Sequence, residues 1–180
     1  MRIIAGKYKG RKLVYNNDNY FRPTLDRVKE SMFNVLGEDV VDSNMLDLFC
    51  GGGSLGLEAL SRAALRAAFV DNNKQILEIV KKNAVNLKTE HKARFHLQDA
   101  FEFLQNYSGL SFDIILADPP YNLECGSKIC ELAAAKDILR IGGILVLERS
   151  KQEHPQQNML KLVKQSKFGQ TQVDYYIREV

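Results

Sequence analysis

Residues 45–60, MLDLFCGGGSLGLEAL, join an apolar run of strand type, a glycine-rich turn and an apolar stretch of helical type. Gly51, Gly53 and Gly56 follow the spacing G-x-G-x-x-G. Glycines at this spacing permit a tight turn and let a ligand approach the backbone. The segment therefore predicts a strand, a ligand-binding loop and a helix, although a tight turn that is merely rich in glycine stays possible. A phosphate-binding P-loop is disfavoured because no Lys-Ser/Thr pair follows.

The rest of the chain repeats this alternation. Strand-type runs occupy residues 45–49, 67–71, 93–97, 112–117 and 143–148, and amphipathic segments lie between them near 54–62, 73–87, 99–106 and 123–139. Strands that alternate with helices predict an α/β fold with a doubly wound, mostly parallel sheet. Residues 159–168 and 171–177 flank Gly169-Gln170, which predicts a closing antiparallel hairpin.

The N-terminal part has a different character. Short apolar pieces at residues 3–4 and 13–14, separated by Gly6 and Gly10, suggest a small hairpin, and Thr24 is a plausible N-cap for a following helix. We expect residues 1–40 to form a basic extension with a helix and residues 41–180 to form the main domain.

Composition narrows the class of protein. The 180 residues are 45% hydrophobic and 26% charged, as in ordinary soluble domains. No apolar run approaches the ~20 residues that span a bilayer, and the N-terminus lacks the apolar core of a signal peptide, so a cytoplasmic protein is expected. Three widely spaced cysteines, with the histidines far from them, predict neither a disulfide framework nor a metal site.

Positive charge is concentrated at the start of the chain. Residues 1–30 contain eight Lys/Arg and three Asp/Glu, although the whole chain carries only +3. The first fifteen residues hold five cations and no acid: Arg2, Lys7, Lys9, Arg11 and Lys12. Such an arm is typical of a polyanion-binding attachment, and a solvated tail is an equally good interpretation of charge alone.

Two acids follow predicted strands. Asp71 ends the second strand, twenty residues after Gly51, where a carboxylate can accept hydrogen bonds from ribose hydroxyls. Asp99 follows the third strand and could reach an adenine amino group. Each is also a plausible helix cap. Together they favour a cofactor that contains adenosine, which leaves NAD and S-adenosylmethionine open.

The fourth predicted strand runs directly into Asp118-Pro119-Pro120-Tyr121. Two prolines make a stiff turn of carbonyl acceptors beside a carboxylate. Asp118 and the Pro119 carbonyl could hold an exocyclic amine while Tyr121 stacks on its ring, which would orient the amine nitrogen toward a methyl donor. A rigid turn without function is the alternative. In a doubly wound sheet this turn and the glycine loop would face one crevice.

These motifs resemble those of class I, Rossmann-like S-adenosylmethionine-dependent methyltransferases. Residues 1–6, MRIIAG, then 10–13, GRKL, and the pattern from Arg22-Pro23-Thr24 to Leu36 narrow the likeness. Together with residues 47–62 and 168–171 they resemble the RsmD family, bacterial 16S ribosomal RNA guanine-N2 methyltransferases. The resemblance covers essentially the whole chain.

The resemblance implies N2-methylation of a guanine in 16S rRNA of the small ribosomal subunit. The activated sulfonium methyl group requires no metal, no membrane partner is expected, and a monomer is expected because nothing in the sequence suggests an obligate oligomer. By position, the implied cofactor contacts are Asp47, Phe49, Gly51, Gly53, Asp71, Asn72, Asp99 and Ala100. Asp118, Pro119 and Tyr121 would hold the flipped guanine. Arg2, Lys7, Lys9, Arg11, Lys12, Arg22 and Thr24 would face RNA. Cys50 is not expected to act as a nucleophile.

Three positions depart from the family pattern. The loop reads Cys50-Gly51-Gly52-Gly53 where Ala-Gly-Ser-Gly is usual, and Asp71-Asn72-Asn73 replaces Glu-x-Asp. Ala63 stands where glycine is usual, which costs about 1 kcal/mol if the backbone keeps a positive φ.

Other functions are compatible with parts of the pattern. A DNA or protein-glutamine methyltransferase would share the core, but the N-terminal signature argues against it. An NAD-dependent dehydrogenase would need a catalytic His or a Tyr-x-x-x-Lys pair, and none is visible. A non-catalytic RNA-binding assembly factor would not need the intact Asp-Pro-Pro-Tyr turn.

Overall fold

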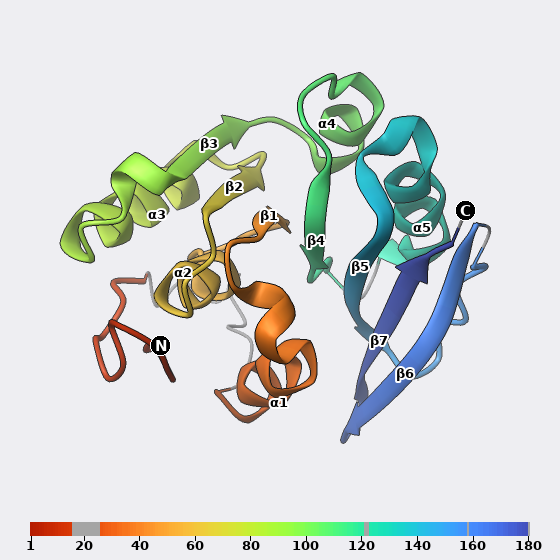
Figure 1. Ribbon diagram of the computed structural model, residues 1–180, viewed down its shortest axis with the longest axis horizontal. Helices are drawn as coiled ribbons and strands as arrows, with labels where there is room; N and C mark the ends of the chain where they lie inside the picture. Colours follow the sequence, from red (N-terminus) through yellow and green to blue (C-terminus); the bar gives the residue numbers. More distant parts are fainter. Residues whose placement is uncertain (16–25, 121–122, 158, 180) are drawn as a thin grey trace.

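The computed structural model describes residues 1–15, 26–120, 123–157 and 159–179. Within them one sheet has seven strands in the order β3-β2-β1-β4-β5-β7-β6 (Figure 1). Five neighbours run parallel: β1 (Asn44–Leu48), β2 (Arg66–Asp71), β3 (Ala93–Leu97), β4 (Phe112–Ala117) and β5 (Leu139–Ser150). This is the doubly wound α/β sheet that the alternating pattern predicted.

The last two strands close the sheet. β6 (Leu160–Phe168) and β7 (Thr171–Arg178) form the predicted antiparallel hairpin, and β7 inserts between β5 and β6. β6 therefore lies at the edge of the sheet, where Lys161, Lys164 and Lys167 are exposed.

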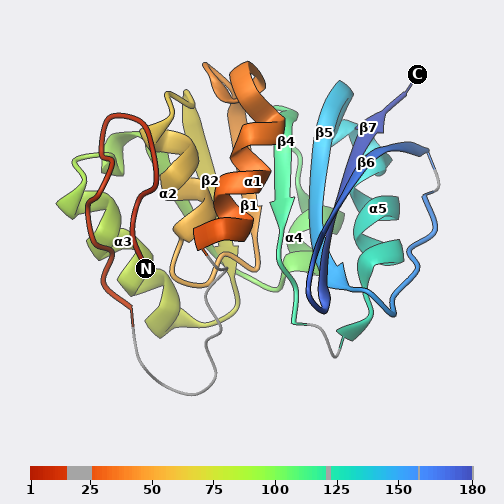
Figure 2. The ribbon, with the colours of Figure 1, turned by 90° about the horizontal axis from the view of Figure 1, so that it is seen from below.

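Helices cover both faces of the sheet (Figure 2). One face carries α1 (Asp26–Leu36), α2 (Ser54–Ser61) and α3 (Lys74–Asn86), whose apolar sides share one core cluster with Met45, Phe69 and Val146. The other face carries α4 (Ala100–Asn106) and α5 (Gly126–Ala134), which pack over Leu46 and Leu145. Short 3-10 turns lie at Gly37–Val40, Glu90–Lys92 and Ala135–Asp137.

The segment before β5 differs from the sequence prediction. We expected a helix over 123–139 and a strand from 143, whereas α5 ends at Ala134 and β5 begins at Leu139. Asp137 has φ +58°, a backbone conformation that breaks a right-handed helix. Leu139 is fully buried and pairs with Phe112, so burial against β4 extends the strand backwards.

Residues 1–15, the N-terminal arm, lie against α2. A single antiparallel bridge joins Arg2 and Lys12 in place of a regular hairpin, and Ile3 and Leu13 are buried in the same cluster as α1, α2 and α3. The Lys7 amide donates to the Ser61 carbonyl at 2.8 Å. The arm is therefore packed on the core, and the division at residue 40 stays a prediction.

In the described ranges, none of the helices combines the length and the apolar character needed to cross a bilayer.

Candidate active site

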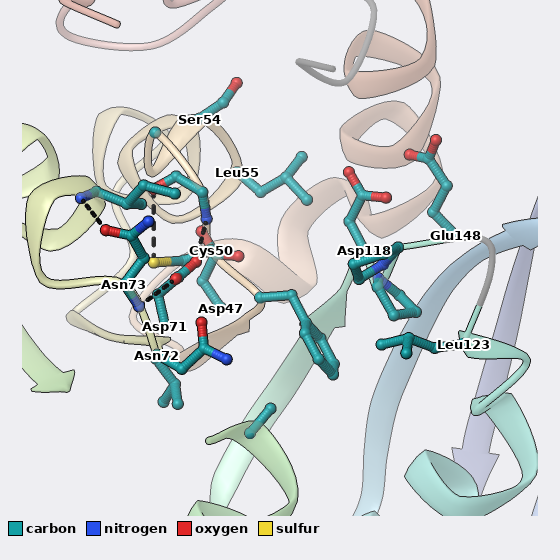
Figure 3. A pocket seen from close by; sticks show the side chains of 18 of the residues that line it. Asp47, Cys50, Ser54, Leu55, Asp71, Asn72, Asn73, Asp118, Leu123 and Glu148 are labelled. Carbon is teal, nitrogen blue, oxygen red and sulfur yellow. Dashed lines mark hydrogen bonds between the residues drawn. The ribbon is translucent and has the colours of Figure 1, made fainter. Parts of the chain in front are cut away.

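A pocket of about 670 Å³ opens at the carboxyl ends of the parallel strands (Figure 3). The strand order reverses between β1 and β4, and in doubly wound sheets ligands bind at this reversal. The residues that line the pocket include Asp47, Phe49, Cys50, Gly51, Gly52, Ser54, Asp71, Asn72, Asn73, Ile76, Asp99, Ala100, Phe101, Asp118, Pro119, Leu123, Glu148, Phe168 and Thr171. The volume is in the range of small-ligand sites.

The glycine loop is shaped by positions where side chains do not fit. Gly51 and Gly53 have φ of +48° and +74°. A Cβ on Gly53 would lie 2.6 Å from a Val80 methyl group, and one on Gly56 would lie 2.3 Å from the Phe69 ring. Gly51 lines the pocket, whereas Gly53 does not and instead occupies the N-cap position of α2. A direct contact of Gly53 with the cofactor stays a prediction.

Asp47 fixes the loop from behind. Its side chain is buried on β1, and its Oδ2 accepts a hydrogen bond from the Gly56 amide at 2.8 Å. Burial raises the pKa of the Asp47 carboxyl well above its usual value, and the nearby Asp118 and Asp71 add to this. The bond ties the first turn of α2 to the end of β1.

Asp71 links the glycine loop to the turn that precedes α3. It is half-buried where β2 ends, and its carboxylate accepts from the Gly51 amide at 3.1 Å and the Asn73 amide at 2.9 Å. Burial raises its pKa. Asn72 is exposed at the rim, and Asn73 caps α3 by accepting from the amides of Gln75 and Ile76. The departure at residues 71–73 thus supplies a helix cap.

Asp99 caps a helix and also lines the pocket. Its Oδ1 accepts from the amides of Phe101 and Glu102 at 2.8 and 3.1 Å, so it caps α4. It also lines the pocket beside Ala100 and Phe101, and Phe101 packs edge-on against Phe49.

Asp118 and Pro119 lie at the end of β4, on the side of the pocket away from Asp71 (Figure 3). Asp118 is half-buried and Pro119 is buried. Tyr121, the predicted stacking residue, lies outside the described residues. The structure therefore brings eight of the predicted site residues to one pocket with Asp118, namely Asp47, Phe49, Gly51, Asp71, Asn72, Asp99, Ala100 and Pro119.

Cys50 is the cysteine in the wall of this pocket. Burial raises the pKa of the Cys50 thiol well above its usual value, which disfavours the reactive thiolate. Among the residues that the structure describes, no group of three or more His, Cys, Asp or Glu could hold a metal ion.

The five predicted RNA-facing cations of the arm, Arg2, Lys7, Lys9, Arg11 and Lys12, are all exposed. Arg2 also pairs with Asp26 at 2.9 Å, and Arg11 donates to the Asn86 carbonyl at 3.1 Å. Met1 lines the pocket, so the first residue of the arm lies at the pocket wall. Arg22 and Thr24 lie outside the described residues.

Sequence reasoning missed several residues of the wall. Glu148 directly follows the apolar run 144–147 of β5, and a carboxylate after an apolar strand run was a signal that could have found it. Phe168 and Thr171 come from the β6–β7 hairpin. Nothing in their local sequence indicates that this hairpin returns to the pocket.

Comparisons with known proteins agree with this geometry. The family model Conserved hypothetical protein 95 matches residues 1–177. Ribosomal RNA small subunit methyltransferase D of Haemophilus influenzae is 37% identical over 153 residues, which cover 84% of this chain and 79% of that protein. The Escherichia coli protein of the same name is 40% identical over 121 residues, which cover 67% of this chain and 60% of that protein.

Solved structures give the same fold. The protein yhhF from Escherichia coli superposes with a TM-score of 0.90 at 31% identity, covering 99% of this chain and 98% of that one. An RNA methyltransferase from Salinibacter ruber, in complex with S-adenosyl-L-homocysteine, superposes at 0.68 with 16% identity, covering 88% and 94%. The second likeness concerns the fold alone. With the match over residues 1–177 and these relatives, the chain belongs to the RsmD family and has a methyltransferase fold.

Proposed function

We propose that this protein transfers the methyl group of S-adenosylmethionine to the exocyclic N2 of a guanine in 16S rRNA of the small ribosomal subunit. The observation that carries the proposal is the position of Asp118-Pro119, which lies in one pocket with the glycine loop, Asp71 and Asp99. An acceptor for an amine and a site suited to an adenosine cofactor thus meet in one cavity. The names of the relatives support RNA of the small subunit as the substrate.

The residues present suit this cofactor. Gly51 and Gly52 expose backbone to the pocket beside the start of α2, and the Asp71 carboxylate lies where ribose hydroxyls would donate. Ile76 and Phe101 supply apolar surface for the adenine ring near Asp99. S-adenosylmethionine supplies a methyl group that its sulfonium already activates, so the protein needs only to position the acceptor.

In this proposal Asp118 holds the amine. Its carboxylate and the Pro119 carbonyl accept hydrogen bonds from the N2 amine, which aims the nitrogen lone pair at the methyl carbon. The lone pair forms the new N–C bond while the C–S bond breaks and its electrons remain on sulfur. One N2 proton then passes to water by way of Asp118. The guanine reaches the pocket by leaving its stack, a cost of a few kcal/mol.

The N-terminal arm is the proposed RNA contact. The arm carries five exposed cations, and its first residue, Met1, lines the pocket. This arrangement suits phosphate binding around the flipped base. Replacing Lys7, Lys9 and Lys12 by Gln should weaken binding of small subunits, flatten its salt dependence and leave cofactor affinity unchanged, as filter binding at several salt concentrations would measure.

The decisive experiment is transfer of labelled methyl from S-adenosylmethionine to small subunits that lack the modification, with naked 16S rRNA in parallel and nucleoside analysis of the product. Labelled N2-methylguanosine is the expected result. Asp118→Ala should abolish it and keep cofactor affinity, whereas Asp39→Ala, an exposed acid away from the pocket, should behave as wild type. Tight cofactor binding without label in rRNA would refute the substrate and redirect the search to DNA or protein.

A further inference from the structure

We propose that Glu148 selects guanine in this pocket by accepting a hydrogen bond from the N1–H of the flipped base. The inference rests on the proposed function and deepens it, because it assigns base specificity to a residue outside the Asp-Pro-Pro-Tyr turn.

Strand register brings Glu148 beside Asp118. β4 and β5 run parallel, with Leu116 opposite Val146 and Ala117 opposite Leu147. Asp118 directly follows Ala117 at the end of β4, and Glu148 directly follows Leu147 on β5. Because neighbouring strands lie about 4.8 Å apart, this register places the two residues side by side. Figure 3 shows both carboxyl groups directed into the same end of the pocket, opposite Asp71.

The surroundings give Glu148 a strong influence on what binds there. Its side chain is only 6% exposed, although it lines the pocket. Leu123 and Phe168 provide apolar surface at the same end. In such a poorly solvated place a carboxylate interacts strongly with a donor brought beside it and disfavours an acceptor.

The edge of guanine fits this pair of acids. Guanine presents N1–H and the N2 amine as adjacent donors, and Asp118 and Glu148 offer adjacent acceptors. Adenine presents the N1 lone pair as an acceptor at the corresponding position, which would face the Glu148 carboxylate. Glu148 touches the base and not the reacting methyl group, so its effect is on which base is held and how it is oriented.

The test compares guanosine with 2,6-diaminopurine at the modified position. Diaminopurine keeps the 2-amino group that receives the methyl, but its N1 is an acceptor. Small subunits are rebuilt with ligated 16S rRNA that carries either base, once the modified nucleotide has been mapped with the wild-type enzyme. We expect the wild type to prefer guanosine roughly 10- to 100-fold in kcat/KM.

Glu148→Gln should lower kcat/KM for guanosine at least about tenfold and narrow or invert the preference, because the Gln amide can donate to N1 of diaminopurine. Glu148→Asp, which keeps the carboxylate, should lose rate but keep the preference for guanosine. Glu131→Gln, on the exposed side of α5, is the matched control. Calorimetric titration of S-adenosylmethionine checks that each variant is folded and binds the cofactor with wild-type affinity.

An unchanged ratio of guanosine to diaminopurine in Glu148→Gln would overturn the inference, even if both rates fell, because an equal fall is what a purely structural residue would give. That result would leave the proposed function intact, since the wild type would still form N2-methylguanosine. Absence of N2-methylguanosine with the wild type would overturn the proposed function and the inference together.

Discussion

Glu58, in the second turn of α2, connects the N-terminal arm to the core. Its carboxylate accepts from the amides of Ile4 and Ala5 at 2.7 and 3.0 Å and from Arg62 Nε at 2.8 Å. Lys29 Nζ lies 3.8 Å away, and the side chains of Lys29 and Glu58 are both fully buried. Replacing Glu58 by Gln keeps the volume and one acceptor but removes the charge opposite Lys29.

The magnitude follows from burial. Removing one partner of a buried ion pair costs about 3–5 kcal/mol, because the other charge is left uncompensated. With an m-value of about 2 kcal/mol per molar urea, Glu58→Gln should lower the unfolding midpoint by about 1.5–2.5 M. The matched control is Glu78→Gln on α3. Glu78 pairs with Lys81 at 2.7 Å, but its side chain is 56% exposed, so the expected change stays within about 0.5 kcal/mol.

The loss of stability in Glu58→Gln should also depend on pH. Burial lowers the pKa of Lys29, and the negative charge of Glu58 opposes that effect. A lowered pKa in the folded state means that the unfolded state binds the proton more tightly, so this group's contribution to stability rises with pH up to its usual value of 10.5. Without the Glu58 charge the pKa falls further. The penalty of Glu58→Gln should therefore shrink as the pH is raised toward 10.5.

Urea unfolding followed by circular dichroism measures the free energy, and trypsin cleavage after Lys7 or Lys9 reports release of the arm. Lys29→Met in the Glu58→Gln background removes the uncompensated charge and should recover part of the stability. If Glu58→Gln and Glu78→Gln shift the midpoint equally, or if Lys29→Met destabilises the Glu58→Gln protein further, the electrostatic reasoning is wrong.

Three further predictions concern backbone and buried charge. Ala63 has φ +75°, so Ala63→Gly should stabilise by about 0.5–1 kcal/mol and raise Tm by about 1–4 °C in calorimetry, whereas Ala59→Gly inside α2 should destabilise. Gly56→Ala places a methyl group against Phe69 and should lower both stability and cofactor affinity in thermal-shift titrations. Asp47 has a raised pKa in the folded state, so its contribution to stability is present below pH 3.8 and is lost as the pH rises toward the folded-state pKa. The urea midpoint of Asp47→Asn should therefore rise relative to that of the wild type as the pH is raised from 3.8.

Each of these has a clear contrary result. A lower Tm for Ala63→Gly would mean that the surrounding turn, and not glycine's freedom, sets the energy at that position. Wild-type affinity in Gly56→Ala would show that α2 shifts without consequence for the loop. A difference between Asp47→Asn and wild type that stays constant with pH would show that the folded protein does not hold a proton on Asp47.

Local sequence predicted the parts of the fold that local forces determine. The strand runs and the glycine loop carry their own periodicity and turn chemistry, so β1 to β4 and the loop lie where the sequence placed them. The end of α5 was wrong because a positive φ at Asp137 and burial of Leu139 against β4 depend on tertiary contacts.

The candidate site divides in the same way. The positions of Asp71, Asp99 and Asp118 were predictable because each lies at or within two residues of the end of a strand that the pattern identifies. The position of Glu148 after an apolar run could have marked it as a candidate, but its place beside Asp118 follows only from the register of β5 with β4. Thr171 reaches the pocket only because β7 inserts beside β5. Strand order and register arise from long-range packing, which a single stretch of sequence does not encode. Tyr121, Arg22 and Thr24 stay predictions.

The lysines of β6 bear on how this protein behaves when concentrated. A strand at the margin of a sheet offers backbone donors and acceptors to any other extended chain, and this invites aggregation. Met159 and Val163 are exposed on or beside β6, and their apolar surface would strengthen such contacts. Lys161, Lys164 and Lys167 would place like charges against one another if two copies of this margin met. The lysines of the closing hairpin thus oppose pairing of this edge strand with the same strand of a second molecule.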